Sequence, residues 1–317
     1  MDKIKVGLIG AGSIARKHLE VIRDLDCVEA VGITSRTMAK AEQLANDFGI
    51  RCCVDSADRL IHQAKPDALL VLVSEDQTFA VTASLIPYGL PLFIEKPAGL
   101  TPQENRRLAS LAKKRSLKTM VGFNRRYYSI FRKGMEIIRK HGPLLGVDIE
   151  GHERIWRIHE STKFSKEVIA HWIFASSTHT IDLLRFFGGE PKKISAIAHS
   201  YKEPGGDQLA ALLEFASGAI GQYRAYWYSP GGWKVVLYGD GATVEFKPLE
   251  NGQWTDKNFN THEIKPDDID LKYKPGFFRQ MEAFARLVMN GNRDWPLLDL
   301  AGACETMRLA ERIKGKQ

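Results

Sequence analysis

A glycine-rich turn near the start of the chain has the residue types and the spacing that bind a pyrophosphate. The apolar run Val6-Gly7-Leu8-Ile9 leads directly into Gly10-Ala11-Gly12-Ser13-Ile14-Ala15, and a helical pattern follows. The first glycine of such a turn permits the bend, the second lets backbone approach the phosphates, and a small residue such as Ala15 lets the helix pack close to the strand. The helix N-terminus adds free N–H groups and a partial positive charge. We therefore predict that a dinucleotide contacts Gly10, Gly12, Ser13 and Ile14.

A lysine stands where a later apolar strand ends. The segment Leu92–Glu95 is followed by Lys96 and Pro97. Ligands of open α/β sheets bind beyond the carboxyl ends of the strands, so Lys96 is predicted to point toward the cofactor, with Glu95 beside it. The alternative is a strand-terminal lysine in solvent. Ser74, at the end of another predicted strand, is assigned to the cofactor site as well.

The elements that must position these residues alternate between short strands and amphipathic helices over residues 1–122, which predicts a doubly wound parallel sheet of the Rossmann type. Thr101-Pro102-Gln103-Glu104 has the form of a capping box, so a helix is expected from there to about Arg115. The predicted strands are Lys5–Ile9, Val28–Thr34, Ala68–Ser74, Leu92–Glu95 and Thr119–Val121.

The pattern changes in residues 123–317, which we predict to be a second domain of helices and mainly antiparallel strands. Turn signals at Ser217-Gly218, Pro230-Gly231-Gly232 and Asp240-Gly241 separate consecutive strands, which must then be antiparallel. The predicted strands are 145–154, 194–200, 208–216, 219–228, 233–238 and 242–247. The predicted helices are 127–140, 178–187, 277–289 and 300–314, and Asp299 is expected to cap the last one.

Three motifs together resemble one family of oxidoreductases. The Gly-x-Gly-x-x-Ala start, Glu95-Lys96-Pro97 and His179-Thr180-Ile181-Asp182 look like those of the glucose–fructose oxidoreductase, inositol dehydrogenase and rhizopine-catabolism proteins (Gfo/Idh/MocA). The resemblance implies an NAD(P)-dependent dehydrogenase or reductase that moves hydride between nicotinamide and a hydroxyl or ketone of a sugar, polyol or sugar nucleotide. It also implies that residues 123–317 form a substrate-binding and oligomerisation α+β domain with a large, open, mainly antiparallel sheet. It implies that Lys96 contacts the nicotinamide ribose and the reacting oxygen, where an ammonium stabilises developing alkoxide charge.

The same resemblance assigns the catalytic acid/base to His179, since an imidazole titrates near working pH. Similar proteins carry an aspartate four residues earlier, where this chain has Ala175. A hydroxyl of Ser176, Ser177 or Thr178 is the predicted replacement, and His171 is a second candidate acid/base. Asp182 is expected to pair with a basic group. The missing aspartate leaves two alternatives open: a non-catalytic sugar or nucleotide sensor, or a glycosidase that uses tightly held NAD.

The residues at the end of the second predicted strand indicate whether the chain prefers NAD(H) or NADP(H). An acidic residue there would bind the adenosine ribose and exclude a 2′-phosphate. The chain has Ser35, Arg36 and Thr37 there, with Lys40 just after. Arginine pairs with phosphate and the neighbouring residues offer hydroxyls, so NADP(H) is the predicted cofactor and NAD(H) the alternative.

Substrate contacts are predicted from sugar chemistry, in which aromatic faces combine with polar groups. Asn124 and Arg126 follow the last parallel strand, and Trp172 and Ser176 precede His179. We assign these four residues, together with Lys96 and His179, to the substrate. Strand alternation places Tyr226 and Tyr228 on one side of the sheet and Trp227 on the other, so these three are not expected to share a pocket.

Composition narrows the partners of the 317-residue chain. The net charge of +7 is spread along the sequence, which excludes a nucleic-acid stripe and favours anionic small molecules. The four cysteines have no metal-site spacing, so we expect no metal and a reducing, cytoplasmic compartment. No membrane span is expected. The open sheet is expected to form a homodimer or homotetramer.

Overall fold

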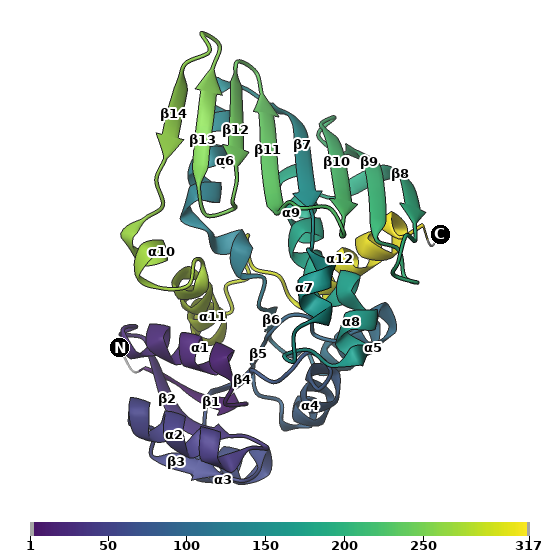
Figure 1. The fold of residues 1–317 in the computed structure, drawn as a ribbon. Coiled ribbons are helices and arrows are strands. Elements are labelled where there is room, and N and C mark those ends of the chain that lie inside the picture. Colours follow the sequence, from purple (N-terminus) through teal and green to yellow (C-terminus); the bar gives the residue numbers. More distant parts are fainter. Residues whose placement is uncertain (1–2, 316–317) are drawn as a thin grey trace. The chain divides into compact units, whose positions relative to one another are not determined.

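The computed structural model describes residues 3–315, which form two compact units (Figure 1). The N-terminal unit comprises Met1–Asn124 and Ile269–Cys304, and the C-terminal unit comprises Arg125–Asp268 and Glu305–Gln317. The division of roles between residues 1–122 and 123–317 stays a prediction. Local sequence patterns do not reveal that residues 269–304 return to the N-terminal unit and pack within it.

The N-terminal unit contains a six-stranded parallel sheet with the order β3-β2-β1-β4-β5-β6. This order confirms the predicted Rossmann sheet, in which the strand order reverses between β1 and β4 while all strands stay parallel. All five predicted strands are present, although β4 and β5 end earlier than expected, and β3 was not predicted. The strands are β1 (Ile4–Ile9), β2 (Val28–Thr34), β3 (Cys52–Val54), β4 (Ala68–Val71), β5 (Leu92–Ile94) and β6 (Thr119–Val121).

Helices cover both faces of this sheet. Helices α1 and α11 pack together on one face, while α3, α4 and α5 contribute to a shared apolar core on the other. The predicted capping box is confirmed, because Thr101 Oγ1 accepts the Glu104 N–H and the Glu104 side chain accepts the Thr101 N–H. The helical segments are α1 (Ser13–Arg23), α2 (Met38–Phe48), α3 (Ala57–Ala64), α4 (Thr78–Leu85), η1 (Ile86–Tyr88), α5 (Pro102–Lys114), η2 (Asn124–Tyr127), α10 (Asp268–Lys272) and α11 (Phe277–Asn290).

The C-terminal unit contains an eight-stranded sheet with the order β14-β13-β12-β11-β7-β10-β9-β8. Every pair is antiparallel except β7 with β10, which confirms the predicted mainly antiparallel sheet. Strands β10 and β11 run in opposite directions, as the turn at 230–232 predicts, but they are not neighbours because β7 lies between them. The strands are β7 (Leu144–Gly151), β8 (Pro191–His199), β9 (Gln208–Phe215), β10 (Ile220–Tyr226), β11 (Trp233–Gly239), β12 (Ala242–Phe246), β13 (Gly252–Asp256) and β14 (Thr261–Ile264).

One face of the eight-stranded sheet packs against α6 and α9. Phe131 of α6, Phe187 of α9 and Phe246 of β12 meet there as an aromatic cluster, in which Phe131 lies edge-on to both other rings. The helical segments that complete the chain are α6 (Ser129–His141), α7 (Ile155–His159), α8 (Lys166–Ala170), the π-helix η3 (Ile173–Ser177), α9 (Thr178–Gly188) and α12 (Leu300–Ile313). Asp299 caps α12 as predicted, accepting the Gly302 N–H at 2.8 Å.

The opposite face of this sheet exposes apolar side chains. Ile197 of β8, Leu212 of β9 and Ile220 of β10 are each more than half exposed. They lie diagonally across adjacent strands, because Leu212 pairs with Ser195 and Gln222. Within residues 3–315, none of the helices combines the length and the apolar character needed to cross a membrane.

Candidate functional site

The glycine turn of the N-terminal unit requires glycine at its first position. Gly10 has φ +113°, and a Cβ there would lie 2.3 Å from the Leu72 carbonyl oxygen. The Gly10 N–H donates to the Thr34 carbonyl at 2.8 Å, which ties the end of β1 to the end of β2. Both the backbone conformation and the close approach of β4 therefore exclude a side chain.

Gly12 lies at the N-terminus of α1 in open space. A Cβ built there would meet nothing within 4 Å, and α1 has no side-chain cap. The first N–H groups of a helix have no partner within the helix, so those of Ser13 and Ile14 remain available for a ligand. Of the four residues predicted to hold a pyrophosphate, Gly10 is buried in the turn, whereas Gly12, Ser13 and Ile14 form the accessible start of α1, which fits an anionic phosphate group.

The end of β2 carries the residues predicted to select the cofactor. Arg36, Thr37 and Lys40 are exposed, and the Thr37 N–H donates to Ser35 Oγ at 3.3 Å. Arg36 and Lys40 make no ion pair with any carboxylate of the part of the chain that is described. Two cations and two hydroxyl groups therefore stand together at this strand end, a set of donors that suits a phosphate.

Lys96 lies two residues beyond the end of β5 and is half-buried. Its N–H donates to Glu95 Oε2 at 3.2 Å, and His18 Nε2 of α1 donates to Glu95 Oε1 at 2.8 Å. Both His18 and Glu95 are buried. Burial raises the pKa of Glu95, but the hydrogen bond and charge of His18, together with the charges of Lys274 and Lys96, hold that pKa below its ordinary value. Glu95 is thus an ionised group that faces the interior beside Lys96, and its predicted cofactor contact stays a prediction.

The remaining predicted residues of the N-terminal unit make contacts within the protein. Ser74 follows β4, and its hydroxyl donates to Asp76 Oδ1 at 2.6 Å. Asn124 is buried, and its Nδ2 donates to the Pro275 carbonyl at 3.0 Å. Asn124 therefore joins the end of the parallel sheet region to the returning segment.

In the C-terminal unit, His179 lies in the first turn of α9 and is 7% exposed. Its ring centroid is 6.0 Å from that of Trp233, the first residue of β11. The guanidinium carbon of Arg125 lies 4.4 Å from the centroid of the same indole. The Arg125 guanidinium and the His179 imidazole thus both lie next to the indole ring of Trp233. Neither Trp233 nor Arg125 is among the site residues predicted from the sequence.

Glu153 organises the segment before α9 and was not predicted. It accepts hydrogen bonds from Trp172 Nε1 at 3.0 Å, Ser176 Oγ at 3.3 Å and Ser177 Oγ at 2.6 Å. The carboxylate is buried and lies two residues beyond the end of β7. The sequence pattern concealed this residue, because Glu153 falls within the predicted strand 145–154, which ends at Gly151 in the structure.

Ala175, at the position of the family aspartate, is buried within the π-helix η3. The hydroxyls predicted to replace the aspartate are bound instead: Ser176 and Ser177 donate to Glu153, and Thr178 donates to the Phe174 carbonyl. A carboxylate is therefore present near this helix start, but it comes from the end of β7. π-Helical turns are frequently found at functional sites.

Asp182 forms the ion pair that the sequence predicts. Arg126 donates to it through two nitrogens at 2.6 and 2.9 Å, and Thr306 Oγ1 donates to Asp182 Oδ1 at 2.8 Å. Arg126 and Asp182 are both buried. Burial lowers the pKa of Arg126, but the adjacent Asp182 carboxylate outweighs it and raises that pKa. Arg126 therefore uses its guanidinium nitrogens to hold Asp182. Its predicted contact with the substrate stays a prediction.

The prediction that Tyr226, Trp227 and Tyr228 do not share a pocket is wrong. All three line one pocket of about 330 Å³, together with Tyr201, Asp207 and Gln208, and we call this the aromatic pocket. The predicted alternation itself continues past the end of β10, because Tyr226 is exposed, Trp227 is buried and Tyr228 is half-buried.

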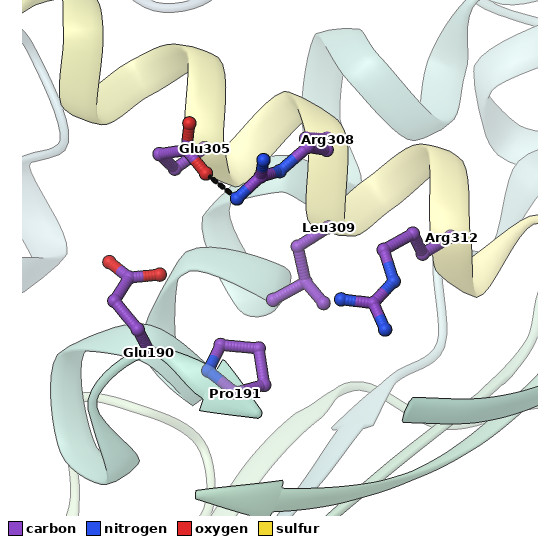
Figure 2. Close-up of a pocket in the computed structure, with 6 residues that line it drawn as sticks. All are labelled: Glu190, Pro191, Glu305, Arg308, Leu309 and Arg312. Carbon is purple, nitrogen blue, oxygen red and sulfur yellow. Dashed lines mark ion pairs between the residues drawn. The ribbon is translucent and has the colours of Figure 1, made fainter. Parts of the chain in front are cut away.

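Figure 2 shows a different pocket of about 250 Å³, formed by α12 and the segment before β8. Its charged residues are two glutamates and two arginines, and Arg308 pairs with Glu305. It contains none of the predicted site residues. In the described residues, no cluster of three or more His, Cys, Asp or Glu side chains could hold a metal ion.

The chain matches two family models, one for each of its predicted domains. Residues 4–123 match an oxidoreductase family with an NAD-binding Rossmann fold, and residues 147–245 match the Gfo/Idh/MocA C-terminal domain. Rhizopine catabolism protein MocA of Rhizobium meliloti is 26% identical, over 44% of this chain and 43% of that protein. The chain therefore spans less than half of MocA in that alignment.

Other similar proteins align over most of the chain. D-xylose 1-dehydrogenase (NADP(+)) 2 of Haloferax volcanii is 20% identical over 97% of this chain and 95% of that protein. The scyllo-inositol 2-dehydrogenase (NAD(+)) of Bacillus subtilis is 21% identical over 91% and 87%.

Solved structures share the fold. A dehydrogenase from Chromobacterium violaceum superposes with a TM-score of 0.84 at 19% identity, covering 99% of this chain and 94% of that one. UDP-N-acetylglucosamine 3-dehydrogenase of Acidithiobacillus ferrooxidans superposes with a TM-score of 0.78 at 17% identity, covering 100% and 98%. Because both family models and the glycine, lysine and histidine motifs agree, the chain belongs to the Gfo/Idh/MocA family of NAD(P)-dependent oxidoreductases.

Proposed function

We propose that the protein transfers hydride between NADP(H) and a secondary hydroxyl or ketone of a sugar, polyol or sugar nucleotide. One observation carries the proposal: the glycine turn after β1 and Lys96 after β5 lie at the same edge of the parallel sheet, separated only by β4. Two strand spacings are about 10 Å, so a ligand held at the turn extends toward Lys96. The xylose, inositol and UDP-N-acetylglucosamine dehydrogenases among the similar proteins support the substrate class.

In this proposal Lys96 polarises the reacting oxygen. Its ammonium donates a hydrogen bond to the substrate oxygen and stabilises the negative charge that develops there as the C–H bond breaks. The bound nicotinamide would supply the hydride acceptor or donor. His179 accepts the hydroxyl proton during oxidation and returns it during reduction, so proton and hydride are both accounted for.

Glu153 takes a positioning role. It holds Trp172 and Ser176, two residues assigned to the substrate, and thereby fixes the segment that leads into His179. Of the other predicted substrate residues, Asn124 and Arg126 use their polar groups on Pro275 and Asp182. We therefore propose Trp172, Ser176, Lys96 and His179 as the substrate contacts.

NADP(H) is the proposed cofactor because Arg36 and Lys40 lie with Ser35 and Thr37 at the end of β2, and NAD(H) is the alternative.

The proposed assembly is a homodimer or homotetramer joined through the exposed face of the eight-stranded sheet. Four cysteines without disulfides support a reducing, cytoplasmic location.

The proposal is tested by screening sugars, polyols and sugar nucleotides for a change in NADPH absorbance, and then by Lys96→Ala. The variant should lose at least a hundredfold in turnover while NADPH affinity, measured by fluorescence, changes little. Lys114→Ala, which removes an exposed lysine of the same unit, serves as the control. An unchanged rate in Lys96→Ala removes Lys96 from the mechanism. Nucleotide binding without turnover of any substrate favours the sensor, and cofactor that survives purification without net turnover favours the glycosidase.

A further inference from the structure

We propose that the aromatic pocket of the C-terminal unit is a carbohydrate site that binds one neutral pyranose ring. The pocket has a volume of about 330 Å³ and is lined by four aromatic side chains: Tyr201, Tyr226, Trp227 and Tyr228. Pockets that bind small molecules are mostly apolar and contain a few placed polar groups. The aromatic pocket has both components.

The aromatic rings are presented to solvent. Tyr201 is 63% exposed and Tyr226 is 43% exposed, which is unusual for side chains of this size. Tyr201 lies edge-on to Tyr228, with ring centroids 5.9 Å apart and an interplanar angle of 81°. Two aromatic walls therefore meet nearly at a right angle. A pyranose, whose ring faces carry C–H groups, can pack on one wall and direct its hydroxyls at the other.

Trp227 and Gln208 complete the lining of the pocket. Trp227 is 4% exposed, so its ring is fixed by packing inside the protein. The exposed amide of Gln208 supplies a hydrogen-bond donor and an acceptor that a sugar hydroxyl can use.

The pocket is held open by the protein itself. Both carboxylate oxygens of Asp207 are used, accepting the N–H groups of Tyr201, Lys202 and Glu203 at 2.7–2.9 Å. The backbone N–H of Trp227 donates to the backbone carbonyl of Asp207 at 2.9 Å. The segment between β8 and β9 is thus fixed to the end of β10, and little ordering remains to oppose binding.

The charges around the pocket favour a neutral ligand. Lys202 Nζ lies 5.1 Å from the Tyr201 ring centroid and 4.7 Å from that of Tyr228. Glu203 accepts hydrogen bonds from Tyr228 and His159, and Asp207 is a second carboxylate. These two carboxylates offset the ammonium groups of Lys202 and of Lys314, whose Nζ lies close to Gly205, so no excess of positive charge selects an anionic sugar.

The aromatic pocket is separate from the residues around His179. It lies at the ends of β9 and β10, whereas Trp233, which contacts His179, begins β11 on the other side of β7. Two strand spacings, about 10 Å, separate the two positions. The inference therefore does not depend on the proposed redox reaction.

Saturation-transfer NMR with methyl β-D-glucopyranoside, in the absence of nucleotide, tests the proposal. Tyr201→Ala should weaken binding about tenfold because one aromatic wall is lost, while Tyr201→Phe should stay within about twofold of the unchanged protein. Phe259→Ala, at an 89% exposed ring away from the pocket, is the control.

Three outcomes would overturn the proposal: no saturation transfer to the glucoside at millimolar concentration, equal binding by Tyr201→Ala, or tighter binding of methyl β-D-glucuronide than of the neutral glucoside. Titration of the same samples with NADPH separates this result from the proposed function. Loss of NADPH binding contradicts the redox proposal and leaves the carbohydrate site standing.

Discussion

His18 and Glu95 form a buried pair that joins the helix of the glycine turn to the strand end that carries Lys96. His18 Nε2 lies 2.8 Å from Glu95 Oε1, and the Lys96 N–H donates to the other oxygen of the same carboxylate. The His18 ring packs against Phe93 of β5 and Phe277 of α11. This buried hydrogen-bonded pair thus connects the proposed phosphate-binding turn with the proposed catalytic lysine.

The His18–Glu95 pair should make stability depend on acid pH. Because the pKa of Glu95 is lowered in the folded protein, its contribution is complete above the ordinary glutamate pKa, about 4.3, and is lost as pH falls through the lower folded-state value. In urea unfolding, Glu95→Ala should cost about 3 kcal/mol at neutral pH. Below about pH 4.3 the free energy of unfolding should fall more steeply for the unchanged protein than for Glu95→Gln.

The exposed pair Arg132–Glu136 provides the matched control for this experiment. Arg132→Ala should cost less than about 1 kcal/mol, since exposed ion pairs contribute little. Parallel pH curves for the unchanged protein and Glu95→Gln would contradict the role of the His18–Glu95 pair.

Arg36→Ala should shift the cofactor preference. Loss of a charge-assisted contact to a 2′-phosphate is worth about 2 kcal/mol, so NADPH affinity should fall by about thirtyfold while NADH affinity stays nearly constant. Fluorescence titration with both reduced nucleotides measures this. Arg51→Ala, at another exposed arginine of the same unit, should change neither affinity. Tighter binding of NADH than of NADPH by the unchanged protein refutes the preference.

Arg126 and Asp182 should behave as a structural pair. Arg126→Gln leaves a buried carboxylate with fewer donors and should destabilise the protein by about 3–5 kcal/mol in thermal or urea unfolding. Arg224→Gln, which breaks the more exposed pair with Glu150, should cost less than about 1 kcal/mol. Full stability combined with a raised KM in Arg126→Gln would instead favour the substrate contact predicted from the sequence.

Glu153→Gln tests the proposed positioning role. An amide has one acceptor oxygen where the carboxylate has two, so it cannot hold Trp172 and both serines as Glu153 does. Turnover should fall about tenfold to a hundredfold, with NADPH affinity unchanged. Glu167→Gln, on nearby α8 and exposed, is the control. A purely structural role for Glu153 would lower the melting temperature and leave kcat of the folded fraction intact.

The exposed face of the eight-stranded sheet should hold the proposed oligomer together. Ile220→Lys places a charge among Ile197 and Leu212 and should convert the assembly to monomers in light scattering after gel filtration. Leu271→Lys, at an exposed leucine of the N-terminal unit, should leave the assembly intact. A monomeric unchanged protein rules out the proposed assembly.

Local signals predicted the elements that carry strong patterns. The glycine turn, the capping box at Thr101 and the Asp299 cap were each confirmed, because each depends on residues close together in the sequence. Strands β3, β13 and β14 were missed since they are short and show little apolar alternation. Their formation depends on pairing with a neighbouring strand.

Residue contacts across the chain were harder to predict. The partner of Asp182 could be anticipated as a basic group but not as Arg126, which is 56 residues away. The role of Glu153 could not be predicted because the three groups that donate hydrogen bonds to it, on Trp172, Ser176 and Ser177, lie about 20 residues later in the sequence. The aromatic pocket was not predicted because residues on opposite sides of a strand were assumed not to line one pocket, whereas Tyr226, Trp227 and Tyr228 alternate in burial and still border the same pocket.

The return of residues 269–304 to the N-terminal unit has a consequence for biosynthesis. The six-stranded sheet is complete once residue 121 has been translated, yet α11, which covers the face formed with α1, is made more than 150 residues later. Until then the apolar surface that receives Phe277 and Phe284 has no cover. A nascent chain in this state is a natural client for chaperones on the ribosome, and a fragment that stops at residue 124 would leave that surface open.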